Sequence, residues 1–324
     1  MIDSAIILAV SAATQRSNLT EERPSAMLPA LGKPMVVRVM DRLYQAGIRQ
    51  YVVVVGINEG AVASYLNKQW KPDAKIEFLL RANESTGTLI TRIAHKLDKP
   101  FLLASYNTFT NERFIDTILR QNENSPDHLI LTGTRQTLSS HPEVHYGIIK
   151  DGLITSIATD RPEEGQQSLI LAELAVCGRS VITHLKALDD REAENYGSNL
   201  FHLTQSYLKS NTAKVEVAET SWVLRVERDS DLLLLNKRLL EDSNDSHILS
   251  ELPYSVKIIP PVRIDPQVSV GQSAIIGPYV YVERGSSIGY GAKIRNAIVL
   301  ERATVPADSE NENVIVTTKG IIKT

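Results

Sequence analysis

The sequence predicts an α/β domain with a mostly parallel sheet, followed by a smaller domain in which short parallel strands wind into a β-helix. Over the first 150 residues, short apolar runs alternate with segments of helical periodicity, which is typical of stacked β-α-β units. From Val262 onward, small or branched residues recur every six positions, which is typical of hexapeptide coils. The 324 residues suffice for two domains.

The expected strands of the first domain are mainly unbroken apolar runs, which suit a sheet covered by helices on both faces. Between the runs, apolar residues keep helical spacing, as at Met35, Val39 and Leu43. An amphipathic helix is expected near 200–209. The predicted strands cover 5–10, 51–55, 76–80, 101–104, 128–131, 147–150, 171–177 and 214–217.

A closing helix is predicted at 229–242. Its first turn is acidic and Lys237-Arg238 follow later, an arrangement that suits the helix dipole. We therefore expect a first domain at 1–242, a linker at 243–259, and a second domain with its tail at 260–324.

The six-residue repeat defines the second domain. Glycines follow the repeat at 271, 277 and 289, where a turn without a Cβ costs least. Two sets of inward positions are predicted: Val262, Val268, Ala274, Val280, Ser286, Ala292 and Ile298, and Ile264, Val270, Ile276, Val282, Ile288, Ile294 and Leu300.

Composition restricts the expected partners. Lysine and arginine number 35 against 38 aspartates and glutamates, so the net charge of −3 gives no field that would attract nucleic acid or an anionic membrane. Cys177 is the only cysteine, which excludes an intrachain disulfide. The apolar run near the N-terminus is too short to span a membrane. We expect a cytoplasmic protein that binds neither nucleic acid nor membrane.

The connection at 11–33 is long for an α/β unit, which normally joins strand to helix within a few residues. It leaves the carboxyl end of the first strand, where open α/β sheets bind their ligands. We interpret it as a ligand-binding loop, with a plain surface insertion as the alternative.

The segment "AIILAVSAATQRSNLTEERPSAMLPALGKPMVVRVMDRLYQAGIRQYVVVVG" resembles the opening of the sugar-1-phosphate nucleotidylyltransferases, or NDP-sugar pyrophosphorylases. That family has a strand followed by G-x-G-T-R, then P-K and a G-K-P turn. The resemblance implies a Rossmann-like mixed sheet and a left-handed parallel β-helix. The matching positions are Thr14, Leu19, Thr20, Arg23, Pro24, Leu28, Pro29, Gly32, Lys33 and Pro34.

In this family a sugar phosphate attacks the α-phosphorus of a nucleoside triphosphate and pyrophosphate leaves, so catalysis depends on neutralising charge. Two loop glycines that admit the phosphates correspond here to Ser11 and Ala13, beside the retained Thr14. In the base-binding G-T-A-G segment, Gly87 is retained but Glu84 stands where a glycine is usual.

The family's phosphate-binding cations are replaced. Gln15 stands at the arginine of G-T-R, and Ser25 at the lysine that follows Pro24. Arg16 is the one nearby cation that offers a substitute, although its offset by one residue is expected to point it elsewhere.

The two aspartates that hold Mg²⁺ in the family are also missing. The Gly-Asp after the fourth strand reads Tyr106-Asn107, and the late aspartate becomes Leu224, or Arg225 when aligned from the following helix. An amide is a poor replacement for a carboxylate at Mg²⁺. No cofactor is therefore assigned, and Mg²⁺ is expected only if the chain is active.

The sugar-phosphate side keeps more of the pattern. Tyr146-Gly147 matches the family's Y-G turn, and Asp160-Arg161 is similar in charge to its E-K pair. A simple turn and an exposed ion pair are the alternative interpretation. The family's N-A-G segment, which precedes its sugar-pocket strand, is replaced here by Leu-Ala-Glu at 171–173.

His141 and His145 are spaced like metal ligands on a helix, but Pro142 argues against a helix there. We therefore interpret both histidines as loop residues.

Two functions follow from the resemblance. One is a non-catalytic regulatory, ligand-sensing or scaffold subunit that binds a nucleotide or sugar phosphate; the other is an active nucleotidylyltransferase with substituted ligands. Because four motif positions change together, we favour the first.

We also expect a homo-oligomer, or a hetero-oligomer with a catalytic paralogue, formed through 262–305, because Ile275, Tyr279 and Tyr281 lie off the inward positions. Docking on the chain's own α/β lobe is the alternative.

Overall fold

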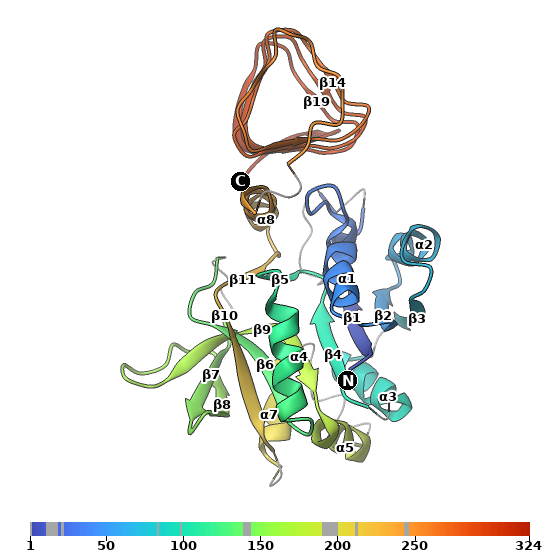
Figure 1. Cartoon of the computed structure of the whole chain (residues 1–324), viewed down its shortest axis with the longest axis vertical. Helices are drawn as coiled ribbons and strands as arrows, with labels where there is room; N and C mark the ends of the chain where they lie inside the picture. Colours follow the sequence, from blue (N-terminus) through green and yellow to red (C-terminus); the bar gives the residue numbers. More distant parts are fainter. Residues whose placement is uncertain are drawn as a thin grey trace. The chain divides into compact units, whose positions relative to one another are not determined.

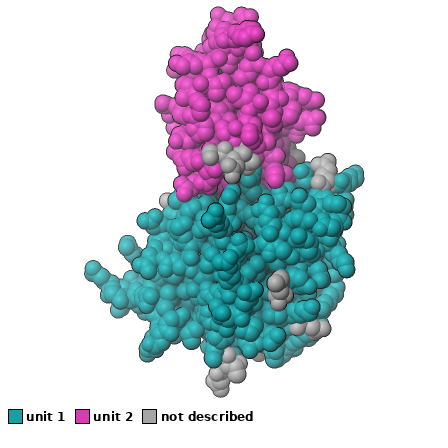
Figure 2. Space-filling view, viewed as in Figure 1, with its two compact units in different colours: residues 1–12, 36–225 teal, residues 13–35, 226–324 magenta. Residues whose placement is uncertain are grey.

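Contacts between residues divide the chain into two compact units, coloured separately in Figure 2. Unit 1 contains 1–12 and 36–225, and unit 2 contains 13–35 and 226–324. The helix after residue 228 and the connection before residue 35 thus group with the C-terminal strands, whereas the sequence analysis assigned both to a first domain at 1–242. The computed structural model describes residues 2–10, 19–20, 23–82, 84–97, 99–138, 144–189, 200–210, 213–242 and 246–324.

Unit 1 is built on a mixed sheet, which confirms the predicted α/β fold (Figure 1). Its main path runs β10-β6-β9-β4-β1-β2-β3, and only β9 is antiparallel to its neighbours on that path. A hairpin of β7 and β8 joins beside β9. The strands are β1 (Ser4–Ala9), β2 (Gln50–Gly56), β3 (Lys75–Arg81), β4 (Phe101–Ser105), β6 (Leu129–Thr134), β7 (Tyr146–Lys150), β8 (Leu153–Ala158), β9 (Ser168–Cys177) and β10 (Val215–Thr220).

Helices of unit 1 pack their apolar residues on this sheet. Leu89 of α3, Val181 of α5 and Phe201 of α7 belong to one buried cluster with strand residues such as Phe101 and Leu131. None of the helices in the described ranges is long and apolar enough to span a membrane. The helices are α1 (Met35–Gln45), α2 (Gly60–Gln69), α3 (Thr86–Lys96), α4 (Phe114–Asn124), α5 (Arg179–Ala187) and α7 (Leu200–Leu208).

A second, two-stranded sheet in unit 1 joins two segments that are distant in sequence. β5 (Thr108–Thr110) follows β4, β11 (Val223–Arg225) follows β10, and the two pair antiparallel. Asn111 strengthens the junction, because its Nδ2 donates to Thr220 Oγ1 at 2.8 Å. The segments that leave two parallel strands are thereby held side by side.

The C-terminal strands of unit 2 wind into a three-sided coil, seen along its axis in Figure 1. Strands of successive turns pair in parallel, and Val262 lies beside Val280, which is 18 residues later. A final antiparallel strand closes the chain. The strands are β12 (Lys257–Ile258), β13 (Val262–Ile264), β14 (Ser269–Val270), β15 (Ile275–Ile276), β16 (Val280–Val282), β17 (Ser287–Ile288), β18 (Lys293–Val299), β19 (Thr304–Val305), β20 (Glu310–Thr317) and β21 (Gly320–Lys323).

The predicted inward positions fail at the seventh repeat. Val280 pairs with Ala297, 17 residues later, so one turn is a residue shorter than the earlier ones. Ala297 and Val299 therefore enter the interior in place of the predicted Ile298 and Leu300. Ile298 instead aligns with Tyr281 on the outer side of the coil.

Helix α8 (Asp229–Glu241) contacts the outer side of β18 and β20. It also anchors the preceding connection, which contains the short 3-10 helix η1 (Ser25–Met27). Asn236 of α8 is 2% exposed; its Oδ1 accepts from the Leu31 amide at 2.8 Å and its Nδ2 donates to the Pro29 carbonyl at 2.9 Å. The buried side-chain amide of Asn236 thus provides hydrogen-bond partners for the backbone of a turn that is far away in sequence.

Tyr281 does not provide the free outer surface that the sequence analysis expected. Its side chain is 1% exposed, and its hydroxyl donates to Asp265 at 2.7 Å. Burial raises the pKa of this phenol. Lys237 of α8 lies over the neighbouring Tyr279 ring at 4.8 Å.

The glycines between turns of the coil are required by close approach. A Cβ added at Gly289 would lie 2.4 Å from the Ala307 amide nitrogen, and one at Gly271 would lie 2.4 Å from that of Tyr290. Neither contact can be relieved by a side-chain rotation, because backbone stands on both sides. Larger residues at these positions must push two turns apart.

We expect Gly289→Ala to lower the free energy of unfolding by about 1–3 kcal/mol, the usual range for overpacking. Gly60→Ala is the control, because no atom lies within 4 Å of the added Cβ at the start of α2. Thermal melts of the two variants measure the difference. Equal melting temperatures would contradict the close approach.

Candidate functional site

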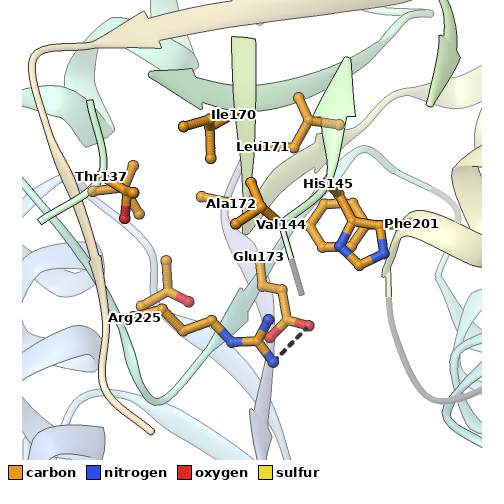
Figure 3. A pocket seen from close by; sticks show the side chains of 11 residues that line it. Thr137, Val144, His145, Ile170, Leu171, Ala172, Glu173, Phe201 and Arg225 are labelled. Carbon is orange, nitrogen blue, oxygen red and sulfur yellow. Dashed lines mark ion pairs between the residues drawn. The ribbon is translucent and has the colours of Figure 1, made fainter. Parts of the chain in front are cut away.

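A pocket in unit 1 lies just beyond the carboxyl ends of three parallel strands. Thr108, Thr137 and Val223 each follow the end of such a strand by three residues, after β4, β6 and β10. The pocket is partly open to solvent, and its volume is about 40 Å³. Ligands of open α/β sheets bind at this edge. The lining residues, shown in Figure 3, are Thr108, Thr137, Val144, His145, Ile170, Leu171, Ala172, Glu173, Phe201, Val223 and Arg225.

Of the two positions that correspond to the family's metal ligands, only Arg225 lines the pocket, and Asn107 lies next to its strand partner Thr108. Asn107 is 7% exposed at the end of β4, and Ser105 Oγ donates to its Oδ1 at 2.7 Å. The next residue, Thr108, pairs directly with Arg225 across the β5–β11 ladder. The two sequence positions are therefore neighbours, although more than a hundred residues separate them.

Strand alternation settles which residue of β11 faces the pocket. Leu224 is fully buried, whereas Arg225 lines the pocket with its side chain 32% exposed. Successive residues of a strand point to opposite sides. Arg225, and not Leu224, is therefore the residue whose side chain reaches the pocket, while its correspondence to the family's late aspartate stays a prediction.

Arg225 is held by a carboxylate on the facing strand. Its Nη2 lies 3.9 Å from Glu173 Oε1, and the Glu173 side chain is only 13% exposed (Figure 3). Glu173 lies at an irregularity of β9, where the register with β6 skips between Leu131 and Thr132. Such bulges turn a side chain away from its regular direction.

The residues at this position do not fit a magnesium ion. Mg²⁺ prefers carboxylates and waters in octahedral geometry. Here an amide and a guanidinium replace two carboxylates, and Glu173 is the one acidic group that lines the pocket. At 4 Å and an effective dielectric constant of 20, each pair of like unit charges costs about 4 kcal/mol, and a divalent ion doubles that cost. Within the described ranges, no group of three histidine, cysteine, aspartate or glutamate side chains could hold a metal.

Polar and aromatic groups complete the wall of the pocket. The Oγ1 atom of Thr108 is buried, with no hydrogen-bond partner among the described residues. His145 stacks on Phe201, with ring centroids 4.2 Å apart and an interplanar angle of 23°. His141, considered with His145 as a metal ligand and set aside, lies outside the described residues.

A second, more open pocket contains the sugar-phosphate residues suggested by the sequence. Tyr146 at the start of β7 and Arg161 beyond β8 both line it, and its volume is about 630 Å³. Gly147 pairs with Leu169 of β9. A Cβ added at Gly147 would lie 3.0 Å from the side chains of Leu171 and Ile154. Asp160 is exposed beside Arg161. The structure therefore brings Tyr146 and Arg161 together, while their proposed ligand stays a prediction.

The segment that resembles the family's base-binding motif carries an ion pair. Glu84 accepts hydrogen bonds from both terminal nitrogens of Arg92, at 3.1 and 3.0 Å. Gly87 is buried in the first turn of α3, where the Ser85 hydroxyl caps the helix by accepting from the Thr88 amide. A charged pair thus stands beside the only glycine of the motif that the sequence retains.

The predicted nucleotide loop lies only partly within the described residues. Five of its proposed residues lie outside the described residues: Ser11, Ala13, Thr14, Gln15 and Arg16. In unit 2, Ser25 is 7% exposed within η1. Arg23, a matching family position, lies 2.9 Å from Glu283 and 3.5 Å from Glu301.

Sequence reasoning missed the role of Glu173. It noted only that this residue replaces a glycine of the family motif. The pairing with Arg225 was hidden because the two residues belong to different strands. A charged residue inside an otherwise apolar strand, "SLILAELAVC", was the available signal.

Known relatives place these features in a family. Residues 4–220 match the nucleotidyl transferase family and residues 258–324 match the GMPPB C-terminal domain. The bifunctional sugar-1-phosphate nucleotidylyltransferase/acetyltransferase of Sulfurisphaera tokodaii is 24% identical over 93% of this chain and 76% of its own length. The UTP–glucose-1-phosphate uridylyltransferase AglF of Haloferax volcanii is 24% identical over 52% of this chain and 68% of its own.

Solved structures share the fold. A putative glucose-1-phosphate thymidylyltransferase from Bacillus anthracis, in complex with a sucrose, has a TM-score of 0.62 at 15% identity, covering 75% of this chain and 97% of its own. HddC from Yersinia pseudotuberculosis, complexed with GMP-PN, has a TM-score of 0.56 at 17% identity, covering 74% and 100%. With the family match over most of unit 1, these findings show that the chain belongs to the nucleotidyl transferase family.

Proposed function

We propose that this chain is a non-catalytic member of the sugar nucleotidyltransferase family that binds a nucleotide or sugar phosphate as a regulatory ligand. The observation that carries the proposal is the guanidinium of Arg225 beside Glu173, at a position where the family resemblance implies a metal-binding carboxylate. A cation built into the chain at that position opposes a catalytic metal. The pocket still offers polar side chains to a ligand, among them Thr108, Thr137 and His145.

The remaining motif changes support the same proposal. Phosphoryl transfer depends on positioning and on charge neutralisation around the phosphates. Ser25 provides no cation and is buried in η1, and Asn107 provides no carboxylate. Removing one such group can cost orders of magnitude in rate, although the effects do not simply add.

An active nucleotidylyltransferase is the competing function, because relatives carry names such as UTP–glucose-1-phosphate uridylyltransferase. Such an enzyme would need its metal to bind through Glu173 and backbone or water ligands, against the charge of Arg225. Turnover separates the two functions directly.

The purified chain is expected to release no pyrophosphate from any common nucleoside triphosphate and sugar 1-phosphate in the presence of Mg²⁺. A coupled pyrophosphate assay over a matrix of these substrates measures it, with an active relative as the positive control. Sustained turnover that depends on both substrates would contradict the proposal.

Changing the two metal positions should create a cation site. The double variant Asn107→Asp, Arg225→Asp removes the repulsive charge and places two carboxylates on paired strands, so Mn²⁺ affinity should rise at least about tenfold. Asn107→Asp is nearly isosteric, and its carboxylate retains the acceptor for Ser105. Paramagnetic resonance of Mn²⁺ measures free and bound ion.

Arg179→Asp is the control for that experiment, because it makes the same charge change as the Arg225→Asp half of the double variant, at an exposed arginine that lies 3.8 Å from the Asp127 carboxylate. It should leave Mn²⁺ affinity unchanged. Equal gains in the control and the double variant would show that the effect is general charge and not a site.

We further propose that the chain assembles with a second copy or with a catalytic paralogue through 262–305. Tyr281 no longer supports this surface, but Tyr290 is 55% exposed on the coil. Light scattering at micromolar concentration is expected to give a mass above that of one chain. A single-chain mass without added paralogue, followed by failure to bind that paralogue, would contradict the proposal.

A further inference from the structure

We propose that Arg225 performs the charge-neutralising role of a metal ion, so that the pocket of unit 1 binds a phosphate group without any divalent cation. The inference rests on the proposed function, because it describes how the same pocket holds its ligand. It follows from two observations: the groups that line the pocket around Arg225 do not fit Mg²⁺, yet Arg225 itself supplies a positive charge there.

The guanidinium is placed to meet an anion. It projects from the end of β11 into the pocket, and with 32% of the side chain exposed it is reachable from solvent. A guanidinium carries five N–H donors in a planar fork that matches the oxygens of a phosphate. Hydrogen bonds from such a charged donor are stronger than neutral ones.

Glu173 forms an ion pair with this cation that helps to fix its direction. The distance of 3.9 Å between Nη2 and Oε1 exceeds hydrogen-bond range. The carboxylate attracts the guanidinium to one side of the pocket, and its 13% exposure means that little water screens the attraction. An arriving phosphate therefore meets an oriented cation and not a flexible one.

Other polar groups that line the pocket favour the same ligand. The hydroxyl of Thr108, cross-strand neighbour of Arg225, is buried and has no hydrogen-bond partner in the described part of the chain. Leaving such a group unsatisfied costs stability, which a phosphate oxygen or a water in the pocket would recover. The imidazole of His145 lies in the same wall.

The phosphate can belong to a sugar phosphate or to a nucleotide, since the chemistry that Arg225 recognises is common to both. Isothermal titration of the full chain should therefore use glucose 1-phosphate, uridine and guanosine mono- and diphosphates, and inorganic phosphate. Each probe is titrated once in EDTA and once in Mg²⁺. We expect at least one probe to bind with the same affinity in both conditions, and the strongest probe identifies the source of the phosphate.

Substitutions of Arg225 test the assignment. Arg225→Gln should weaken the binding of that probe by at least about tenfold, because a charged hydrogen bond is lost. Arg225→Lys should recover part of the affinity, since it keeps the charge but not the fork. Arg179→Gln is the matched control, an arginine with an equally loose ion pair at 3.8 Å, and should bind like the native chain.

Three results would overturn the proposal: binding that requires Mg²⁺, unchanged affinity in a folded Arg225→Gln variant, or no binding of any phosphate probe. If Arg225→Gln does not fold, the affinities of the native chain for the phosphate probes in EDTA and in Mg²⁺ are compared. Binding that requires Mg²⁺ then overturns the proposal. Pyrophosphate release is measured separately, so turnover would refute the absence of catalysis while the metal comparison still tests this inference.

Discussion

The pairing of β5 with β11 is the constraint on which the pocket depends. The two strands are short, and each simply continues a strand of the main sheet past its carboxyl end. Their ladder fixes Thr108 beside Arg225, and the Asn111 side chain ties the same junction to Thr220. Because β9 runs antiparallel between β4 and β6, its Glu173 reaches the same edge from the opposite direction. Three distant segments thus meet at one point.

That meeting point differs in charge from the metal site that the family resemblance implies, because Arg225 adds a positive charge beside the one carboxylate, Glu173. Two carboxylates would attract a divalent ion, whereas Asn107 and Arg225 contribute an amide and a positive charge. The change is more than the loss of ligands, since a lost ligand weakens a metal but a nearby cation repels it. A phosphate group experiences the reverse, because it is attracted by the arginine that the metal avoids.

Local patterns made the fold predictable, while the details of the site depend on pairing between distant segments. Apolar runs and helical spacing located the strands of the sheet, since each pattern is read within one segment. The shortened turn that brings Ala297 inward, in place of Ile298, shows only in the register between turns. The anchoring of α8 through Asn236 and the ion pair of Arg225 with Glu173 likewise join residues far apart in sequence. Helix periodicity could locate α8 but not the surface that it covers.

Several cations at or near the family's motif positions are paired with carboxylates of this chain. Arg23 lies against Glu283, Arg92 against Glu84, and Arg225 against Glu173. An anionic ligand must share or replace these partners, and the cost differs among them. The Arg92 pair is bidentate and the Arg23 pair is within hydrogen-bond distance, whereas the Arg225 pair is about an ångström longer. Because electrostatic attraction falls with distance and the hydrogen-bond term is lost beyond about 3.5 Å, Glu173 holds Arg225 less tightly than Glu84 holds Arg92 or Glu283 holds Arg23.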